Sequence, residues 1–162
     1  MRRNFMTEND IHENRRYIVM SEIMTPDMVN FHGNIHGGHI LGFLDRVAYA
    51  CAARYACKNV VTLSVDQVVF KEPIYVGELV TFLAAVNYVG KTSMEIGIRV
   101  LAENLMTTHS RHTNTCYFTM VSVDEQGKPT KAPPLTIHNE VQQRRFDEAL
   151  LRKEARLKMY KK

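Results

Sequence analysis

The sequence predicts an α+β fold in which a curved antiparallel sheet is wrapped around one long apolar helix. Two observations lead to this prediction: an almost uninterrupted run of apolar and small residues from Ile40 to Ala56, and four strand-like segments after it. Because the run is apolar on more than one face, the helix needs neighbours on most sides. One sheet can supply those neighbours only if it curls around the helix.

Length and composition fit one globular domain. The 162 residues are 45% hydrophobic and 23% charged, and a chain of this length buries roughly two thirds of its unfolded surface. Asp45 and Arg46 interrupt the longest apolar run, which argues against a membrane-spanning helix. Residues 1–14 lack the apolar core of a signal peptide. We therefore expect one cytoplasmic domain over 1–162, with its core over about 17–135 and a helical extension over about 138–160.

The elements are expected in the order strand, helix, antiparallel meander. A first strand over 17–24 stops at a turn containing Pro26, and a loop over 28–38 precedes the long helix at about 39–57. The turn residues Gly90–Ser93 indicate a hairpin between the second and third of the later strands. These later strands are predicted over 60–70, 78–89, 94–103 and 111–123.

The C-terminal segment is predicted to be an amphipathic helix that starts near Val141 after a stiff connection over 129–134. Its arginines and lysines are expected on a solvated face. The apolar side is expected to pack against the domain and consists of Val141, Phe146, Leu150, Leu151 and Leu157.

Charge and metal-binding residue types argue against several classes of function. The formal net charge of +4 comes largely from the last 20 residues, without the aromatic-interleaved basic strand of a nucleic-acid-binding domain. Cys51, Cys57 and Cys116 lack metal-ligand spacing and are expected to be reduced, packed thiols. His36 and His39 have no third ligand at zinc spacing. We expect no metal, no organic cofactor and no nucleic-acid partner.

Asp45 is the residue of the apolar helix that needs an explanation, because burying an unpaired carboxylate is costly. The same helix starts at Gly37 and Gly38. The first amide N–H groups of a helix lack internal partners and can stabilise a carbonyl oxygen that gains negative charge. Simpler roles remain open: the glycines could only form a tight turn, and Asp45 could be a structural acid paired with loop amides or an arginine.

Spacing along the helix predicts that a reaction centre needs two subunits. Asp45 lies seven residues after Gly38, which is about 10 Å along a helix, whereas a base or nucleophile acts within about 3 Å. Two antiparallel helices across a dimer axis would bring Asp45 of one copy to the glycines of the other. The apolar edge strand at 60–70 is predicted to pair across this axis. Asn34 could orient a water or a carbonyl group, or it could simply be a loop residue in a left-handed conformation.

The sequence resembles the acyl-CoA thioesterases of the hotdog superfamily, specifically the cytosolic acyl-CoA hydrolase group. The resemblance lies in residues 33–56, 60–80 and 90–100 and continues at 117–135. In two-domain members of that group, one domain supplies the Asn of a GN-x-HGG loop and the other supplies the helical Asp. Here Asn34 and Asp45 stand in one domain, so a homodimer would have two competent sites. Arg46 departs from the pattern, since many relatives have Glu at this position.

The resemblance implies hydrolysis of acyl-CoA to a free acid and CoA by a homodimer, in which dimers often associate as trimers of dimers. Asp45 would activate water or attack the thioester to give an anhydride, while the Gly37 and Gly38 amides and Asn34 polarise the carbonyl. The CoA phosphates are expected near a surface formed by Lys91, Thr92, Ser93 and Lys58. Two alternatives remain: a hotdog hydratase or dehydratase acting on hydroxyacyl thioesters, and a non-catalytic acyl-CoA sensor.

Overall fold

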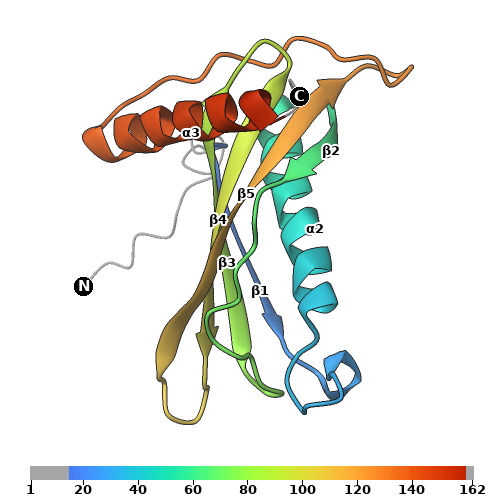
Figure 1. Cartoon of the computed structure of the whole chain (residues 1–162), viewed down its shortest axis with the longest axis vertical. Helices are drawn as coiled ribbons and strands as arrows, with labels where there is room; N and C mark the ends of the chain where they lie inside the picture. The colour runs from blue at the N-terminus through green and yellow to red at the C-terminus, as the bar shows by residue number, and fades with distance from the viewer. Residues whose placement is uncertain (1–14, 160–162) are drawn as a thin grey trace, which may run out of the picture.

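The computed structural model describes residues 15–159, which form one five-stranded antiparallel sheet with a long helix on each face (Figure 1). The strand order across the sheet is β1-β3-β4-β5-β2. Helix α2 (Gly37–Ala56) follows β1 and the short 3-10 helix η1 (Pro26–Met28), and helix α3 (Glu140–Met159) ends the described chain. The strands are β1 (Tyr17–Ile23), β2 (Asn59–Val65), β3 (Leu79–Val89), β4 (Ser93–Glu103) and β5 (Ser110–Val123).

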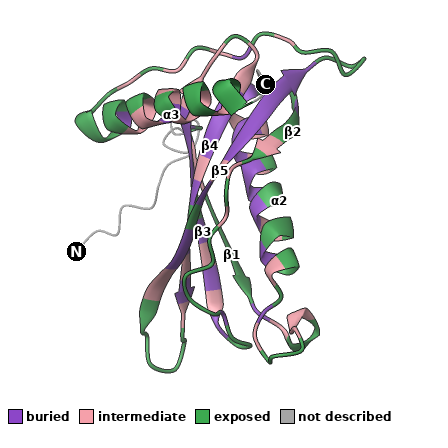
Figure 2. Ribbon diagram, viewed as in Figure 1, coloured by how far each residue is buried: buried purple, intermediate pink, exposed green. Residues whose placement is uncertain are grey.

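The core lies between the sheet and α2. Side chains alternate along a strand, so Ile96 and Ile98 of β4 face the helix, while Glu95, directly before Ile96, faces the other side. The residues of the three central strands that face α2 are almost completely buried, and long stretches of β4 and β5 are accordingly purple in the ribbon of Figure 2. The predicted hotdog arrangement, a curled sheet around a long helix, is therefore confirmed.

Among the sheet strands and α2, most predicted boundaries lie within one residue of the structure, and two differ by more. The strand expected over 60–70 ends at Val65, after a register shift against β5 between Thr62 and Ser64. Beyond it, the Asp66 N–H still donates to the Tyr117 carbonyl, but the regular ladder stops. Helix α2 begins at Gly37, two residues early, because the His36 ring accepts a hydrogen bond from Gly38 and caps the helix.

The predicted apolar side of the C-terminal helix is only partly covered. Phe146 and Leu150 are half-buried, and the Phe146 ring lies 5.2 Å from the Tyr88 ring, centroid to centroid. Leu151 is 67% exposed, and Val141 and Leu157 are also exposed. Instead, Arg152 and Arg156 lie between α3 and the sheet. Long cationic side chains can cover apolar surface with their stems while their charged ends bind an acid.

The prediction that α2 is buried on most sides is wrong for a single chain. Leu41, Asp45 and Tyr49 lie on the exposed side of the helix. The adjoining strand β2 is a sheet edge, where Val61 and Leu63 are exposed. The uncovered helix side and the uncovered edge therefore meet along one flank of the molecule. Among residues 15–159, no helix is long and apolar enough to cross a membrane.

Candidate active site

Asp45 is held at this open flank by a neighbouring strand. Its Oδ1 atom accepts a hydrogen bond of 2.7 Å from Thr62 Oγ1 on the edge strand β2. Its other carboxylate oxygen accepts no hydrogen bond within the described residues. The guanidinium of Arg46 lies 4.3 Å from the Phe43 ring centroid and forms no ion pair with Asp45. One oxygen is thus fixed in place and the other is available to a substrate.

The loop before α2 is organised by Asn30. Asn30 Oδ1 accepts hydrogen bonds from the His32 N–H at 2.8 Å and the Asn34 N–H at 3.2 Å, and the Asn30 N–H donates to the Asn34 carbonyl at 2.7 Å. These bonds fix the orientation of the side-chain amide and leave its NH2 group free for a further acceptor. A cavity of about 310 Å³ is lined by Asn30, Asn34, Gly37 and Phe70.

The two glycine amides at the start of α2 are not equivalent. The Gly38 N–H donates to His36 Nδ1 at 2.8 Å. The Gly37 N–H has no partner within the described residues and belongs to the cavity lining. A Cβ atom at Gly38 would lie 2.9 Å from His36 Nδ1, so the cap requires glycine at this position. Gly37 is therefore the available donor, and Gly38 becomes available only if His36 moves away.

An ion pair anchors the chain on the far side of this loop. Arg111 of β5 binds both carboxylate oxygens of Glu78, and Glu78 also accepts from the Tyr75 N–H at 2.9 Å. Burial opposes ionisation of Glu78, but these hydrogen bonds outweigh it and hold its pKa below the ordinary value. This ion pair fixes the segment around Ile74. The Ile74 carbonyl accepts a hydrogen bond of 2.8 Å from the Ile35 N–H, which belongs to the loop before α2. The ion pair thus supports the Asn30 loop.

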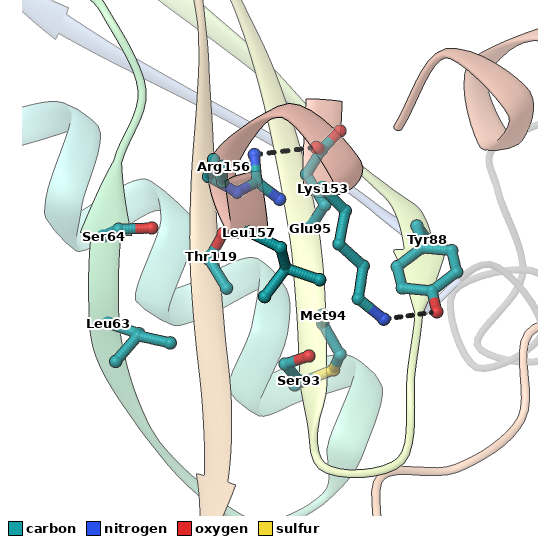
Figure 3. Close-up of a pocket in the computed structure, with 10 residues that line it drawn as sticks. All are labelled: Leu63, Ser64, Tyr88, Ser93, Met94, Glu95, Thr119, Lys153, Arg156 and Leu157. Carbon is teal, nitrogen blue, oxygen red and sulfur yellow. Dashed lines mark hydrogen bonds and ion pairs between the residues drawn. The ribbon is translucent and has the colours of Figure 1, made fainter. Parts of the chain in front are cut away.

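The residues predicted to bind CoA are only partly brought together. Lys58 Nζ donates to the Lys131 carbonyl at 2.9 Å, and the neighbouring Ala132 N–H donates to the Lys91 carbonyl at 3.0 Å. One short segment thus joins both predicted lysines at the end of the molecule where α2 stops. The Thr92 carbonyl accepts from the Ser122 N–H nearby. The predicted residue Ser93 instead lines a cavity beside α3 (Figure 3).

The cysteines have no role at this site. Burial raises the pKa of Cys51 and of Cys116 to about 12, so both thiols stay protonated at neutral pH. Cys57 is exposed at the end of α2. Among the described residues, no three His, Cys, Asp or Glu side chains are grouped closely enough to hold a metal ion.

Comparison with known proteins identifies the family. The family model of the thioesterase superfamily matches residues 32–109. Protein VdlD of Helicobacter pylori is 53% identical over 148 residues, which are 91% of this chain and 84% of that protein. A crystal structure of a hexameric acyl-CoA thioesterase superimposes with a TM-score of 0.86 at 36% identity, covering 90% of this chain and 94% of the other. The chain belongs to the acyl-CoA thioesterases.

A second thioesterase structure shares the fold at lower identity. The acyl-CoA hydrolase of Staphylococcus aureus, solved with butyryl-CoA, CoA and CoA disulfide, has a TM-score of 0.81 and 27% identity. The alignment covers 91% of this chain and 92% of that enzyme. The resemblance inferred from the residues 33–56 and the segments after them is thus confirmed at the level of family and fold.

Sequence reasoning missed two polar residues that the structure places at the site, Asn30 and Thr62. Each carried a signal. Asn30 lies four residues before Asn34 in a loop that contains Gly33. Asn side chains in such loops often bond to the backbone of the residues that follow and so close a turn. Thr62 is the polar side chain of an otherwise apolar stretch of β2 and alternates onto the side of the sheet that faces α2.

Proposed function

We propose that this chain hydrolyses acyl-CoA thioesters to a free carboxylic acid and CoA, with Asp45 as general base or nucleophile. The observation that carries the proposal is the hydrogen bond from Thr62 to Asp45, which holds an exposed carboxylate at the open flank of a hotdog sheet. An acid with one oxygen fixed and the other free is suited to activate water or to attack a carbonyl carbon.

The structures of the Staphylococcus aureus hydrolase support this choice of residues. They include three mutants, in which an Asn, an Asp or a Thr is replaced by Ala; the Asn precedes the Asp by 15 residues, and the Thr follows it by 17. Asn30, Asp45 and Thr62 have the same two spacings. Asn34 does not, so we assign carbonyl or water positioning to Asn30 and a supporting loop role to Asn34.

The reaction breaks the thioester C–S bond, forms a C–O bond and consumes one water. The developing oxyanion is stabilised by the Gly37 N–H at the positive end of α2 and by the Asn30 amide. If Asp45 acts as base, it takes the proton of the attacking water and the CoA thiolate later receives it. If Asp45 attacks, an anhydride forms and water opens it. After a single turnover in 18O-labelled water, 18O in the Asp45 carboxylate would identify the anhydride route with water attacking at the Asp45 carbon, because the general-base route leaves that carboxylate unlabelled.

We propose that each reaction centre combines two copies of the chain. Within one copy, the carboxylate and the Gly37 amide lie more than two helical turns apart on the same helix. Pairing of two β2 edges would align the exposed sides of both α2 helices and place Asp45 of one copy near Asn30 and Gly37 of its partner. The hexameric neighbour is consistent with further assembly as a trimer of dimers. The CoA phosphates are assigned to the end that carries Lys58 and Lys91.

The first test measures thiol release from a panel of acyl-CoAs. Asp45→Ala should lower turnover at least about a hundredfold, the low end for a positioned acid or base, while the fold persists. Asp147→Ala, which removes an exposed helical carboxylate on α3, is the matched control and should leave turnover unchanged. Equal turnover in the two variants would contradict the assignment. A hydratase would change the acyl chain without releasing CoA, and a sensor would do neither.

The second test asks whether the centre is shared. Asp45→Ala and Asn30→Ala chains are each expected to be nearly inactive, but one of the two sites in their heterodimer contains both intact residues. Coexpression should therefore restore up to about a quarter of wild-type activity, because half of random dimers are mixed and half of their sites are intact. No recovery in dimers shown to be mixed would place both residues in a single copy. The cytoplasmic location and the need for no cofactor remain predictions.

A further inference from the structure

A second cavity lies on the sheet face opposite α2, away from Asp45. It has a volume of about 440 Å³, is open to solvent on one side, and is lined by residues of α3, β2, β3, β4 and β5 (Figure 3). A volume of this size is typical of small-molecule sites. Two leucines at its rim are exposed in the single chain: Leu63 at 68%, on the edge strand β2 that is proposed to pair with a second copy, and Leu157 of α3 at 51%. An apolar ligand would cover both.

The charges around this cavity do not balance. Glu95, 1% exposed, binds Arg152 at 2.6 Å and lies 3.5 Å from Arg156, which binds Asp66 at 2.7 Å. These two carboxylates are therefore matched by two arginines. The fifth charged group, Lys153, reaches no carboxylate within the described residues.

Lys153 instead donates to a neutral partner. Its Nζ atom donates to the Tyr88 hydroxyl at 2.9 Å, and both side chains lie against the cavity (Figure 3). A phenol does not neutralise an ammonium group. The outer cavity, defined by the residues labelled in Figure 3, thus carries one uncompensated positive charge beside an apolar surface.

A buried hydroxyl in the same lining also lacks a partner. Thr119 of β5 is 9% exposed, and its Oγ1 atom forms no hydrogen bond within the described residues. Buried polar groups without a partner are uncommon in folded proteins, because they lose their water without compensation. A ligand head group would supply the missing hydrogen bond only by displacing the side chains that cover this hydroxyl.

We propose that the outer cavity binds a fatty carboxylate, whose head group pairs with Lys153 and whose alkyl chain lies along Leu63 and Leu157. The Thr119 hydroxyl lies in the same lining but has almost no accessible surface, so it bonds the ligand only if the side chains over it shift on binding. The site is separate from the reaction centre, since the sheet lies between the outer cavity and α2. The proposed hydrolysis releases an acid of this class, and the identity of the ligand as a product of the enzyme rests on that proposed function.

The test is direct binding of decanoate by isothermal titration calorimetry, using the full chain with Asp45→Ala so that no turnover is involved. Adding Lys153→Gln should weaken binding at least about tenfold, because the charge-assisted hydrogen bond from Lys153 to the carboxylate is lost. Lys158→Gln, the matched control, removes a cation from the same helix outside the cavity and should bind like the parent. Decanol, with the same chain and no charge, should bind equally to the Lys153→Gln and Lys158→Gln proteins.

A second variant tests the cavity without touching Lys153. Leu157→Asp introduces a carboxylate at an exposed rim position, where folding should tolerate it, and should abolish decanoate binding by charge repulsion. The proposal is overturned if decanoate does not bind, or if it binds Lys153→Gln and Leu157→Asp as tightly as the parent. Neither result would affect the proposed hydrolysis, since the assay does not measure thiol release.

Discussion

Helices α2 and α3 are both 20 residues long, yet different forces attach them to the two faces of one sheet. Helix α2 buries seven residues, and every one of them is an aliphatic residue, an alanine or a cysteine. Helix α3 buries only Gln142 and Ala149 and is held by the ion pairs of Arg152 and Arg156. One helix is an integral part of the core, whereas the other is attached by specific charge contacts.

The difference shows what an apolar pattern can predict. The pattern of α2 predicts its buried side correctly because a sheet face rich in Ile, Val and Phe offers no alternative partners. The pattern of α3 fails for Val141, Leu151 and Leu157, although Phe146 packs on Tyr88. Arginines take the central place on this helix because Glu95 points outward from β4 and is buried there. An unpaired buried carboxylate is strongly destabilising, so the side chains that cover Glu95 are cations and not leucines.

The largest effect is expected from truncating the core side of α2. Leu44 is completely buried, so Leu44→Ala should lower the free energy of unfolding by about 2–5 kcal/mol through lost burial and the cavity it leaves. Leu151→Ala on α3 removes the same atoms from an exposed position and should change it by less than about 0.5 kcal/mol. Urea unfolding of both variants provides the measurement. Equal losses would show that α3 packs by its apolar side after all.

A smaller effect is expected from the charges that hold α3. Glu95→Gln leaves Arg152 with a neutral partner and should cost about 1–3 kcal/mol, below the range for fully buried pairs because both arginines are partly exposed. The control Glu148→Gln breaks an exposed i,i+4 pair with Arg144 and should cost less than about 0.5 kcal/mol. Urea unfolding tests both, and no loss in Glu95→Gln would mean that α3 is held by other contacts.

The pH dependence of the free energy of unfolding should have opposite signs for an acid beside the Asn30 loop and an acid beside α3. The pKa of Glu78, next to the Asn30 loop, is lowered. Its contribution to the free energy of unfolding is therefore complete above the ordinary pKa of Glu and is lost as the pH falls through the lowered pKa. The pKa of Asp66, beside α3, is raised because burial outweighs its bond to Arg156. Its contribution is therefore largest in acid and falls as the pH rises through the raised pKa. Glu78→Gln should flatten the acid loss of stability, and Asp66→Asn should steepen it. Unfolding curves between pH 3 and 7 would show parallel profiles if neither acid is shifted.

The smallest perturbation is chemical labelling of the thiols. Burial and the raised pKa keep Cys51 and Cys116 unreactive, whereas Cys57 at the end of α2 is exposed. A thiol reagent at pH 8 should label Cys57 rapidly in the native protein and the other two only after unfolding. Mass spectrometry of the labelled peptides identifies the sites. Rapid labelling of Cys51 would show that α2 opens from the sheet more readily than its packing implies.

Much of the candidate site was predictable, but not all of it. Asp45 and the Gly37–Gly38 start of α2 stand out because a lone acid and paired glycines are unusual within an apolar helix. Asn30 and Thr62 do not stand out, since each acts through a partner that is distant along the chain or lies in a loop whose shape the sequence leaves open. The capping role of His36, which occupies the Gly38 amide, likewise depends on a side-chain rotamer rather than on a residue pattern.

The sequence by itself determined the long apolar helix, the antiparallel meander, the family and the acid in the helix, because local propensity and side-chain periodicity act over neighbouring residues. Only the tertiary structure decided which side of α3 is buried, where β2 ends and which amide at the helix start is free. These outcomes depend on groups such as Glu95, Asp66 and His36, whose partners are chosen by distance in space. The role of a buried charge or an unpaired amide depends on which group lies close enough to bind it.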